Sequence, residues 1–546
     1  MSSAATPDLS FPAPDEVDGL FNWDRMHAPR PLSPLAQDLV ARTLCMGFTD
    51  AYGELGSPLQ MSPMFVHGYY FSRTRAIEDP DERARRVEGY LAGVDGHLER
   101  LGAQWNEEWK PWLATNVEAE LALDLAALAD DDLLPGLDRR AAELRDKWRI
   151  HGRINMSLVS AARFVDHYVA ELSPEDPGEA LEALQGFHTR SVDASIALWD
   201  LGRVLVAHPE LRALFDEGRV PDRSEMKAAP GGIEFVAKLD EALEEFGWRS
   251  DAVYDIADPT WIENPTVALR TAAAYAGQDE TSDPRRRSAA AAQRRESLLA
   301  AARRRLEGEA LERFEYLYDN ARHNNPITED HAFWIDQRSV ALLRRYAQEI
   351  GRRLVERGVF DEIDDVFMLH RPELDGLLEK AADRRALVEE RRVALARANE
   401  VAPPLRLGTP PPPPDYFDPL IDALRVRFQG VKEIPHLSDP SMVPGLAGAP
   451  GVAEGTARVV RSLDEASRLA PGEVMVCEMT LPPWVPLFAL AAAVVADTGG
   501  ELSHCAIVAR EFAIPAVVGT LTGTRTIPDG ARVRVDGTKG LVEILD

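Results

Sequence analysis

The stretch TGGELSHCAIVAREFAIPAVVG, residues 498–519, decides the fold of the C-terminal part of the chain. The run AAAVVAD before it, residues 491–497, indicates a buried strand, the Gly-Gly pair indicates a turn, and CAIVARE indicates a helix. His504 therefore falls at a helix N-terminus, and Ser503 is a good N-cap residue. Unpaired backbone N–H groups and the positive end of the helix dipole favour a bound anion at this point.

This pattern has a specific chemical use. A neutral imidazole at a helix N-terminus can attack phosphorus and carry a phosphoryl group as phosphohistidine. The two glycines, Gly499 and Gly500, allow the backbone to approach a ligand closely. Taken alone, the pattern leaves a second interpretation open, in which His504 is one of the 12 histidines of the chain and only packs in a strand-to-helix turn.

The sequence around this stretch predicts a compact α/β domain over residues 441–546. Short runs rich in β-branched residues, separated by Gly, Pro and Asp, indicate strands at 473–479, 515–520 and 531–545. The pair Asp536-Gly537 is a turn signal within the last run.

The region before this domain has a different composition. Residues 21–400 are rich in Ala, Leu, Arg and Glu, and apolar residues recur at helical spacing, as in residues 82–102 and 294–322. The sequence thus predicts a multidomain protein, with a large, mostly α-helical domain followed by the small α/β domain. Residues 1–20, rich in Pro, Ser and Asp, are expected to form a poorly ordered leader.

A proline-rich linker separates the two regions. Residues 401–440 include five consecutive prolines, Pro410–Pro414, which cannot continue a helix and favour an extended conformation. A semi-rigid spacer acting as a hinge is the favoured interpretation. A ligand for an SH3 domain is the alternative.

Composition and charge exclude several classes of protein. The chain has 546 residues and a net charge of −29, which opposes binding to nucleic acid and to anionic membranes. No apolar run reaches the ~18 residues that span a bilayer, and the N-terminus lacks the features of a signal peptide. We therefore expect a cytoplasmic protein. The three cysteines form no CxxC pair and no zinc-binding spacing, so we expect neither disulfides nor a bound metal.

The C-terminal segment resembles the mobile phosphohistidine domain of the phosphoenolpyruvate-utilising enzymes, a family that includes pyruvate phosphate dikinase and rifampin phosphotransferase. Residues 445–460 and 529–544 extend the resemblance on either side of the TGG turn, the Ser-His pair and the Ile-Pro-Ala-Val-Val-Gly strand. The resemblance implies a swivelling domain in which His504 is phosphorylated. Residues expected to support the phosphoryl group are Thr498, Gly499, Gly500, Ser503 and Arg510.

The resemblance also implies a partner. The helical region shows no Gly-rich nucleotide loop and no strand-rich text typical of an ATP-grasp domain, and the chain ends at Asp546 without a phosphoenolpyruvate-binding barrel. We therefore expect this chain to bind no cofactor itself. ATP and Mg²⁺ are expected on a separate ATP-grasp subunit.

Five helical-region segments resemble the acceptor-binding domain of rifampin phosphotransferase and of two-subunit dikinases such as hydroxyphenylethanone (acetovanillone-type) dikinase and phenylphosphate synthase. These segments are residues 21–35, 62–73, 247–265, 327–338 and 361–369. The predicted acceptor is accordingly a small phenolic compound. The predicted acceptor-binding residues are Trp23, His67, Tyr70, Arg73, Trp261, Asp330, Phe333 and Trp334.

Phosphorylating a phenol of pKa ~10 requires a base and cations that stabilise the transferring group. His331, oriented by Asp330 or Asp336, is the predicted base, and Arg322 and Arg338 are the predicted phosphate clamps. Core packing or ion pairing between helices is the open alternative for each of these residues.

Three functions are consistent with the sequence. The favoured one is a dikinase subunit that passes a phosphoryl group from His504 to the phenolic hydroxyl, while ATP yields AMP and phosphate on the partner. The alternatives are a phosphohistidine relay or regulatory protein without a small-molecule acceptor, and a phosphotransferase that uses phosphoenolpyruvate directly. The identity of the acceptor and the stoichiometry with the partner stay open.

Overall fold

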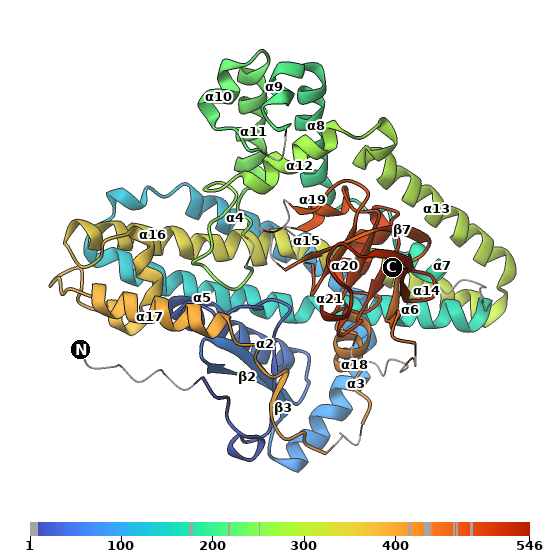
Figure 1. Ribbon diagram of the computed structural model, residues 1–546. Helices are drawn as coiled ribbons and strands as arrows, with labels where there is room; N and C mark the ends of the chain where they lie inside the picture. The colour runs from blue at the N-terminus through green and yellow to red at the C-terminus, as the bar shows by residue number, and fades with distance from the viewer. Residues whose placement is uncertain are drawn as a thin grey trace.

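Two unequal parts make up the fold, a large helical part and a smaller C-terminal α/β domain that lies against one side of it (Figure 1). The structure is a computed structural model that describes residues 9–173, 178–216, 219–250, 252–412, 416–430, 437, 439–461, 465, 468–480 and 484–545. Within these residues, no helix combines the length and the apolar composition that crossing a membrane requires. The predicted order of a helical region followed by a region containing a sheet is confirmed.

Long helices form the body of the helical part. Helix α5 (Asp130–Ile154) packs against α2 (Arg42–Glu54) and α16 (Val340–Glu356), and α6 (Met156–Leu172) packs against α14 (Gly308–Asn324). Their apolar faces meet in one core, which includes the wholly buried aromatic side chains of Trp105, Trp148, Phe164 and Phe314. The other α-helices of the body are α1 (Pro34–Ala36), α3 (Pro80–Ala103), α4 (Lys110–Leu121), α7 (Gly178–Glu182), α13 (Pro284–Arg305), α15 (Ile327–His331) and α17 (Arg385–Asn399).

The two helical stretches predicted from periodicity have different outcomes. Residues 82–102 lie within the single helix α3, as expected. Residues 294–322 are divided between α13 and α14, because Leu306 adopts an extended conformation and buries its side chain between them. Gly308, with φ +56°, starts the second helix in a new direction.

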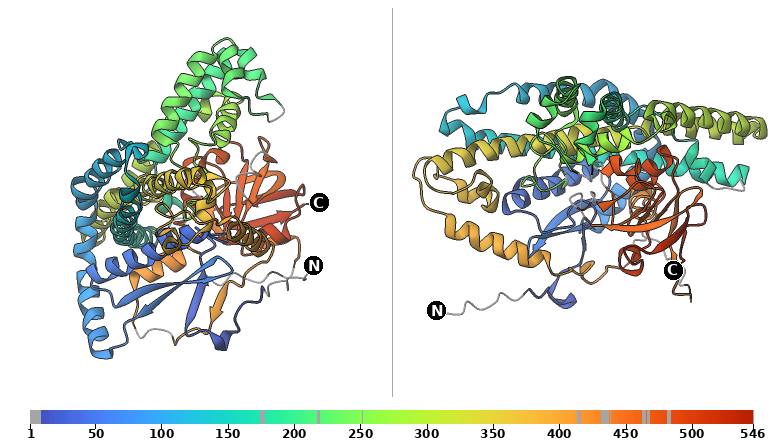
Figure 2. Two further views of the ribbon diagram at one scale, coloured as in Figure 1. Left: turned by 90° about the vertical axis from the view of Figure 1, so that its left-hand side faces the viewer. Right: turned by 45° about the horizontal axis from the view of Figure 1, so that its top comes forward.

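A group of helices rises from the body as a protrusion (Figures 1 and 2). It contains α8 (Arg190–Ala207), α9 (Pro209–Ala213), α10 (Arg223–Ala228), α11 (Gly232–Phe246) and α12 (Thr266–Ala276). These helices enclose an apolar core of their own, with Trp199, Phe235 and Trp261 among its members.

A four-stranded antiparallel sheet, absent from the sequence prediction, covers one side of the body. Its order is β2 (Leu59–Val66), β3 (Tyr69–Ala76), β1 (Leu20–Trp23) and β4 (Arg406–Gly408). Residues 21–400 are therefore mostly, but not wholly, helical. The hairpin turn between β2 and β3 is His67-Gly68, and both residues have positive φ angles, as a tight two-residue hairpin turn requires.

Parts of the predicted leader and linker are held by this sheet. Residues 1–8 of the leader lie outside the described residues, but Phe11 contacts the rings of His67 and Tyr69, and Pro14–Glu16 form a short helix. The described part of the leader is thus structured, unlike the sequence prediction.

The linker has described and undescribed parts. Strand β4 and the helical segments α18 (Pro419–Asp422) and Ala423–Phe428 belong to it, and the latter two pack on α6. The predicted linker also includes residues 413–415, 431–436 and 438, which lie outside the described residues. Its role as a hinge stays a prediction.

The C-terminal domain is built on an eight-stranded mixed sheet. Its order is β5 (Met442–Pro444), β12 (Leu541–Ile544), β11 (Arg532–Asp536), β7 (Val452–Val460), β8 (Val474–Cys477), β9 (Ala493–Ala496), β10 (Ala516–Val518) and β6 (Leu446–Ala449). Strands β7 to β10 run parallel, and β8 and β9 are wholly buried, which explains their continuous apolar text. The predicted strands and the turn at Asp536-Gly537 are confirmed.

Helices connect these strands and dock the domain on the body. Helices α19 (Val485–Phe488), α20 (His504–Glu511) and α21 (Gly523–Thr526) follow β8, β9 and β10. Apolar residues of the domain, including Trp484 and Phe488, belong to the same continuous core cluster as the helices of the body. Both views in Figure 2 show the domain in contact with the helical part.

An ion pair joins the segment before α12 to α16, and its contribution to stability depends on pH. Arg344 Nη2 lies 2.8 Å from Glu263 Oε1, and Arg344 Nε lies 2.9 Å from Glu263 Oε2. Burial raises the pKa of Glu263, but hydrogen bonds from Arg344, Thr260 and Gln348 outweigh burial and lower the pKa to about 2. This depressed pKa stabilises the fold above the ordinary glutamate pKa of about 4.3, and the stabilisation is lost as the pH falls towards 2.

We expect Glu263→Gln to lower the free energy of unfolding by about 1–2 kcal/mol near neutral pH, since the pair is partly solvated. The difference between variant and native chain should shrink as the pH drops below about 4.5. Urea denaturation near pH 7 and near pH 3 measures both values, with Glu312→Gln on the exposed face of α14 as control. A difference that does not change with pH contradicts this account of the pair.

Candidate active site

His504 lies at the first position of α20, at the carboxyl end of the parallel strand β9. Ser503 is the N-cap, and its hydroxyl oxygen accepts a hydrogen bond of 3.4 Å from the backbone N–H of Ala506. The carboxyl ends of parallel strands and helix N-termini are usual places for ligands in α/β domains. The predicted helix start and cap are confirmed, while the binding of an anion there stays a prediction.

The two glycines of the TGG turn pack against the backbone of another segment of the chain. Gly500 N–H donates to the carbonyl oxygen of Phe428 at 2.7 Å, and Leu502 N–H donates to that of Arg427 at 2.9 Å. A Cβ on Gly500 would lie 2.2 Å from the carbonyl oxygen of Arg427. Gly499 has φ +98°, which favours glycine. The close backbone approach therefore joins the turn to the segment Ala423–Phe428.

A carboxylate from the helical part bonds to the histidine. Glu329, on α15, lies with Oε2 3.0 Å and Oε1 3.1 Å from His504 Nδ1. Because an ionised carboxylate only accepts, the neutral ring carries its proton on Nδ1 and keeps the lone pair on Nε2. Nε2 is buried and has no hydrogen-bond partner among the residues that the structure describes. A ring nitrogen with a free lone pair is the atom that can attack phosphorus.

Sequence reasoning missed Glu329, although a signal was present. The segment ITEDH contains three polar candidates in a row, and the residues selected were Asp330 and His331. Only the tertiary structure shows that Glu329 faces His504, which is 175 positions away in the chain.

Further polar contacts join the docked domain to the helical part. Arg25 Nη1 lies 3.3 Å from Glu478 Oε1, and the backbone N–H of Gly186 donates to Glu511 Oε1 at 3.1 Å. Burial raises the pKa of both glutamates. Arg427 forms two ion pairs, one with Glu501 of the α/β domain and one with Asp166 of α6. Arg427 thus connects the predicted linker, the α/β domain and the body.

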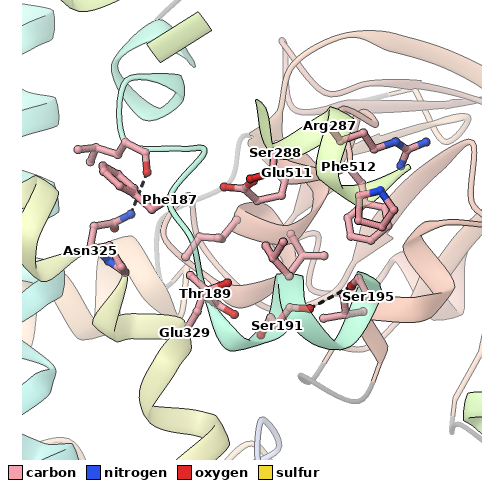
Figure 3. A pocket seen from close by; sticks show the side chains of 17 residues that line it. Phe187, Thr189, Ser191, Ser195, Arg287, Ser288, Asn325, Glu329, Glu511 and Phe512 are labelled. Atoms are coloured by element: carbon pink, nitrogen blue, oxygen red, sulfur yellow. Dashed lines mark hydrogen bonds between the residues drawn. The ribbon is translucent and has the colours of Figure 1, made fainter. Parts of the chain in front are cut away.

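An apolar cleft opens between the two parts (Figure 3). One side is formed by α20 and the other by α8, α13 and the start of α15. Glu329 lines this cleft and also bonds to His504, and Glu511 is a second carboxylate in the wall of the cleft. The apolar lining residues are Leu184, Phe187, Val192, Pro284, Pro326, Val485, Ile507, Val508 and Phe512.

The predicted base lies in a buried cluster of two histidines and an aspartate. His331 Nε2 lies 3.7 Å from Asp336 Oδ2, and His151 Nδ1 lies 3.1 Å from Asp336 Oδ1. Burial and the neighbouring His151 lower the pKa of His331 to about 4. A histidine with this pKa is a weak proton acceptor for a phenol, so its role as base stays a prediction that this environment does not favour. The donor atoms of the three residues could also hold a metal ion.

The predicted acceptor-binding residues fall in separate places. Trp23, His67 and Arg73 lie in the four-stranded sheet and bond to Ala28, Ser10 and Asp18, respectively. Tyr70 points into the body, where its hydroxyl lies 3.1 Å from Cys45 Sγ and its ring is 6.3 Å from that of Tyr254. Trp261 is buried in the protrusion core.

The residues predicted near His331 are closer to the site. Asp330 binds Lys110 Nζ at 3.1 Å and accepts from the backbone N–H of Arg190 at 3.0 Å. Phe333 lies between the guanidinium groups of Arg190 and Arg338, 4.4 and 4.3 Å from its ring centre. Its ring is 4.9 Å from that of Trp334. Asp330, Phe333 and Trp334 do not line the cleft.

The two predicted clamps and the phosphoryl-supporting residues also have defined partners. Arg322 is exposed and paired with Asp319, and Arg338 donates to the carbonyl oxygen of Glu245 at 2.8 Å. Thr498 Oγ1 donates to the carbonyl oxygen of Glu478 at 3.0 Å. Arg510 donates to the carbonyl oxygens of Gly448 and Glu501, and burial lowers its pKa to about 10. In this structure, these residues therefore bond to other parts of the protein.

The environment of Cys505, the residue after His504, lowers the reactivity of its thiol. Cys505 is buried, and burial raises the pKa of its thiol to about 12. A thiol with so high a pKa is scarcely ionised at neutral pH and reacts slowly.

A histidine at a helix N-terminus, with Nδ1 oriented by a carboxylate and Nε2 free, belongs to the class of sites that can carry a phosphoryl group. Comparison with known families agrees with this class. The family model described as "PEP-utilising enzyme, mobile domain", where PEP is phosphoenolpyruvate, matches residues 469–540. The family model described as "Rifampicin phosphotransferase fourth domain" matches residues 151–329. The chain therefore carries the mobile domain of the phosphoenolpyruvate-utilising enzymes, and the predicted resemblance is confirmed.

Similar proteins include named phosphotransferases. The chain is 33% identical to chondramide synthase cmdD of Chondromyces crocatus over 97% of its own length and 14% of that protein. It is 31% identical to the uncharacterized phosphotransferase YvkC of Bacillus subtilis over 67% of this chain and 43% of that protein. It is 30% identical to a rifampicin phosphotransferase of Streptomyces sviceus over 65% of this chain and 39% of that protein. The chain thus spans less than half of each of these relatives.

Proposed function

We propose that this protein acts in ATP-dependent phosphotransfer, carries the phosphoryl group on Nε2 of His504, and delivers it to the hydroxyl of an aromatic acceptor. The observation that carries the proposal is the hydrogen bond from His504 Nδ1 to Glu329, which leaves Nε2 as the nucleophilic atom. The match to the mobile domain and the similarity to named phosphotransferases support the same chemistry.

The acceptor binds where the two parts of the protein meet. The cleft beside α20 offers aromatic and aliphatic walls, including Phe187 and Phe512, for a flat apolar molecule. Glu329 belongs both to this cleft and to the hydrogen bond of His504. An apolar cleft that shares Glu329 with the carrier histidine favours a small-molecule acceptor over a relay to another protein. Small phenols of the acetovanillone type and larger hydroxylated aromatics such as rifampicin are the acceptor classes to compare.

The phosphoryl group comes from ATP bound by an ATP-grasp partner with Mg²⁺. Overall, ATP, water and the acceptor hydroxyl give AMP, inorganic phosphate and the phosphorylated acceptor. On this chain, a P–N bond forms at Nε2 of His504 and is then replaced by a P–O bond to the acceptor, whose hydroxyl proton is released. Between these steps the mobile domain leaves the docked position and returns to it.

The test combines the chain with an ATP-grasp protein encoded near it and with ATP labelled at the β-phosphate. We expect acid-labile label on this chain only when the partner and Mg²⁺ are present, and transfer of the label to a hydroxylated aromatic added later. Label that appears from phosphoenolpyruvate without the partner contradicts the ATP route. Stable label that no hydroxylated aromatic removes, but a second protein does, indicates a relay instead.

The ion pairs of Arg427 give a prediction about docking. Because Arg427 joins Glu501 to Asp166, Arg427→Gln should weaken the docked state and slow transfer to the acceptor by about tenfold, the effect of losing roughly 1.4 kcal/mol. Formation of phosphohistidine, which takes place at the partner, should change little. Rapid-quench measurement of the two steps separates them, and Arg425→Gln in the same segment is the control. Equal slowing of both steps contradicts a role for Arg427 in docking.

A further inference from the structure

Two histidines and an aspartate from three segments meet in the body. His151 lies near the end of α5, His331 ends α15, and Asp336 lies in the π-helical turn Ala332–Ser339. One donor atom from each residue lies within 4.8 Å of the other two. Two imidazole nitrogens and a carboxylate oxygen are the donor set that Zn²⁺ and related ions use in catalytic sites with an open position.

The hydrogen bonds of His331 direct a lone pair into the cluster. Its Nδ1 lies 2.9 Å from the carbonyl oxygen of Ile327, which can only accept, so the neutral ring carries its proton on Nδ1. Nε2 then presents a lone pair to Asp336 Oδ2 at 3.7 Å, and two acceptors face each other. A histidine that binds a metal is commonly fixed in this way, with its other nitrogen bonded to a backbone carbonyl.

The distances within the cluster fit a metal ion. Bonds of about 2.0–2.1 Å in a tetrahedral site place ligand atoms about 3.3 Å apart. His151 Nδ1 lies 3.1 Å from Asp336 Oδ1, His331 Nε2 lies 3.7 Å from the other oxygen, Oδ2, and one ligand atom from each of the three residues lies within 4.8 Å of the other two. Small rotations of the side chains would equalise them.

The surroundings also suit a bound cation. The side chains of the three residues are 10–12% exposed, and the rings of Phe48 and Trp148 lie 5.3 and 5.5 Å from that of His151. Among the described residues, no Lys or Arg side chain bonds to Asp336. Asp336 makes polar contacts with His151 and His331, and a metal ion held by all three residues would also neutralise the buried carboxylate.

We propose that His151, His331 and Asp336 bind one divalent transition-metal ion of the Zn²⁺ class. Glu329, which bonds to His504, precedes His331 by two residues on the same short helix. Because positions two apart on a helix point to different sides, the ion would lie on another side of α15 from the contact between Glu329 and His504, and would join α5 to α15 and to the turn that follows it. Binding of the ion does not rest on the proposed function.

Metal binding can be measured on the full chain without ATP, partner or acceptor. The chain is freed of metal with a chelator and titrated with Co²⁺ and with Zn²⁺. We expect one ion per chain, the visible absorption of four- or five-coordinate Co²⁺, and a rise in melting temperature on adding Zn²⁺. His331→Ala and Asp336→Asn should each weaken binding by about 100-fold or more, whereas His323→Ala, at an exposed histidine, should leave it unchanged.

A second measurement avoids variants that could fail to fold. X-ray absorption of the Zn²⁺-loaded native chain should show two imidazole ligands and one carboxylate at about 2.0–2.2 Å. The inference is wrong if the native chain binds Co²⁺ no more tightly than folded Asp336→Asn protein, or if the absorption spectrum shows no imidazole ligand. Failure of metal binding leaves transfer from His504 intact, and failure of transfer leaves metal binding intact, so the two proposals are tested separately.

Discussion

Replacing His504 with alanine should abolish phosphorylation of the chain, with a fall of about 10³-fold or more in acid-labile label. The reason is that Nε2 of His504 is the nitrogen assigned to carry the phosphoryl group, and alanine offers no nucleophile. Labelled ATP with the ATP-grasp partner measures this directly, and mass spectrometry locates the modified residue. Phosphoramidate, a small chemical donor, gives a second test that needs no partner.

The control for this prediction is His323→Ala. His323 is exposed, and its Nδ1 bonds within its own helix to the carbonyl oxygen of Asp319. Its removal should not change the label. Unchanged labelling of the His504→Ala protein would mean that another residue carries the phosphoryl group, and the assignment of the site would fail.

Glu329→Gln should have the second largest effect. A glutamine can still contact His504 Nδ1, but it can offer an N–H in place of a carboxylate oxygen and so no longer fixes the proton on Nδ1. Orienting groups of this kind contribute about 10–100-fold, so we expect the transfer to the acceptor to slow by that factor.

The signature that separates positioning from folding is the state of the His504 ring. Nitrogen NMR of the native chain should show the proton on Nδ1, and the Glu329→Gln protein should show a mixture of the two tautomers. Glu312→Gln, at an exposed glutamate of α14, is the matched control. A variant with the native tautomer and the native rate of transfer would show that Glu329 does not orient the histidine.

The C-terminal domain could be predicted from the sequence because its signals are local. Fully buried parallel strands such as β8 and β9 give uninterrupted apolar runs, and glycine turns mark their ends. Ser503 as N-cap and His504 as the first helical residue could also be predicted, since a cap depends on neighbours within one turn.

The hairpin β2–β3 was missed although it also carries a local signal. The His67-Gly68 turn stands between two runs with aromatic and β-branched residues. The helical composition of the surrounding 380 residues, 21–400, outweighed this signal. Average composition is therefore a poor guide to a short sheet within a helical region.

The acceptor side of the site could not be predicted because its contacts are distant in sequence. His151 and Asp336 are 185 positions apart, and Glu329 and His504 are 175 positions apart. Aromatic residues chosen for their chemistry, such as Trp261 and Tyr70, proved to be core residues of the protrusion and of the body. Which polar residues face one another depends on how the helices pack, and periodicity does not contain that information.

The most direct test of transfer from His504 to an aromatic hydroxyl is a single-turnover experiment. The chain is phosphorylated with labelled ATP, freed of nucleotide and partner, and mixed with hydroxylated aromatic compounds. The account predicts that an acceptor removes the label from His504 and carries it in stable linkage, with one phosphoryl group transferred per chain. If every compound leaves the rate of label loss unchanged, and all the label appears as inorganic phosphate, the account is contradicted.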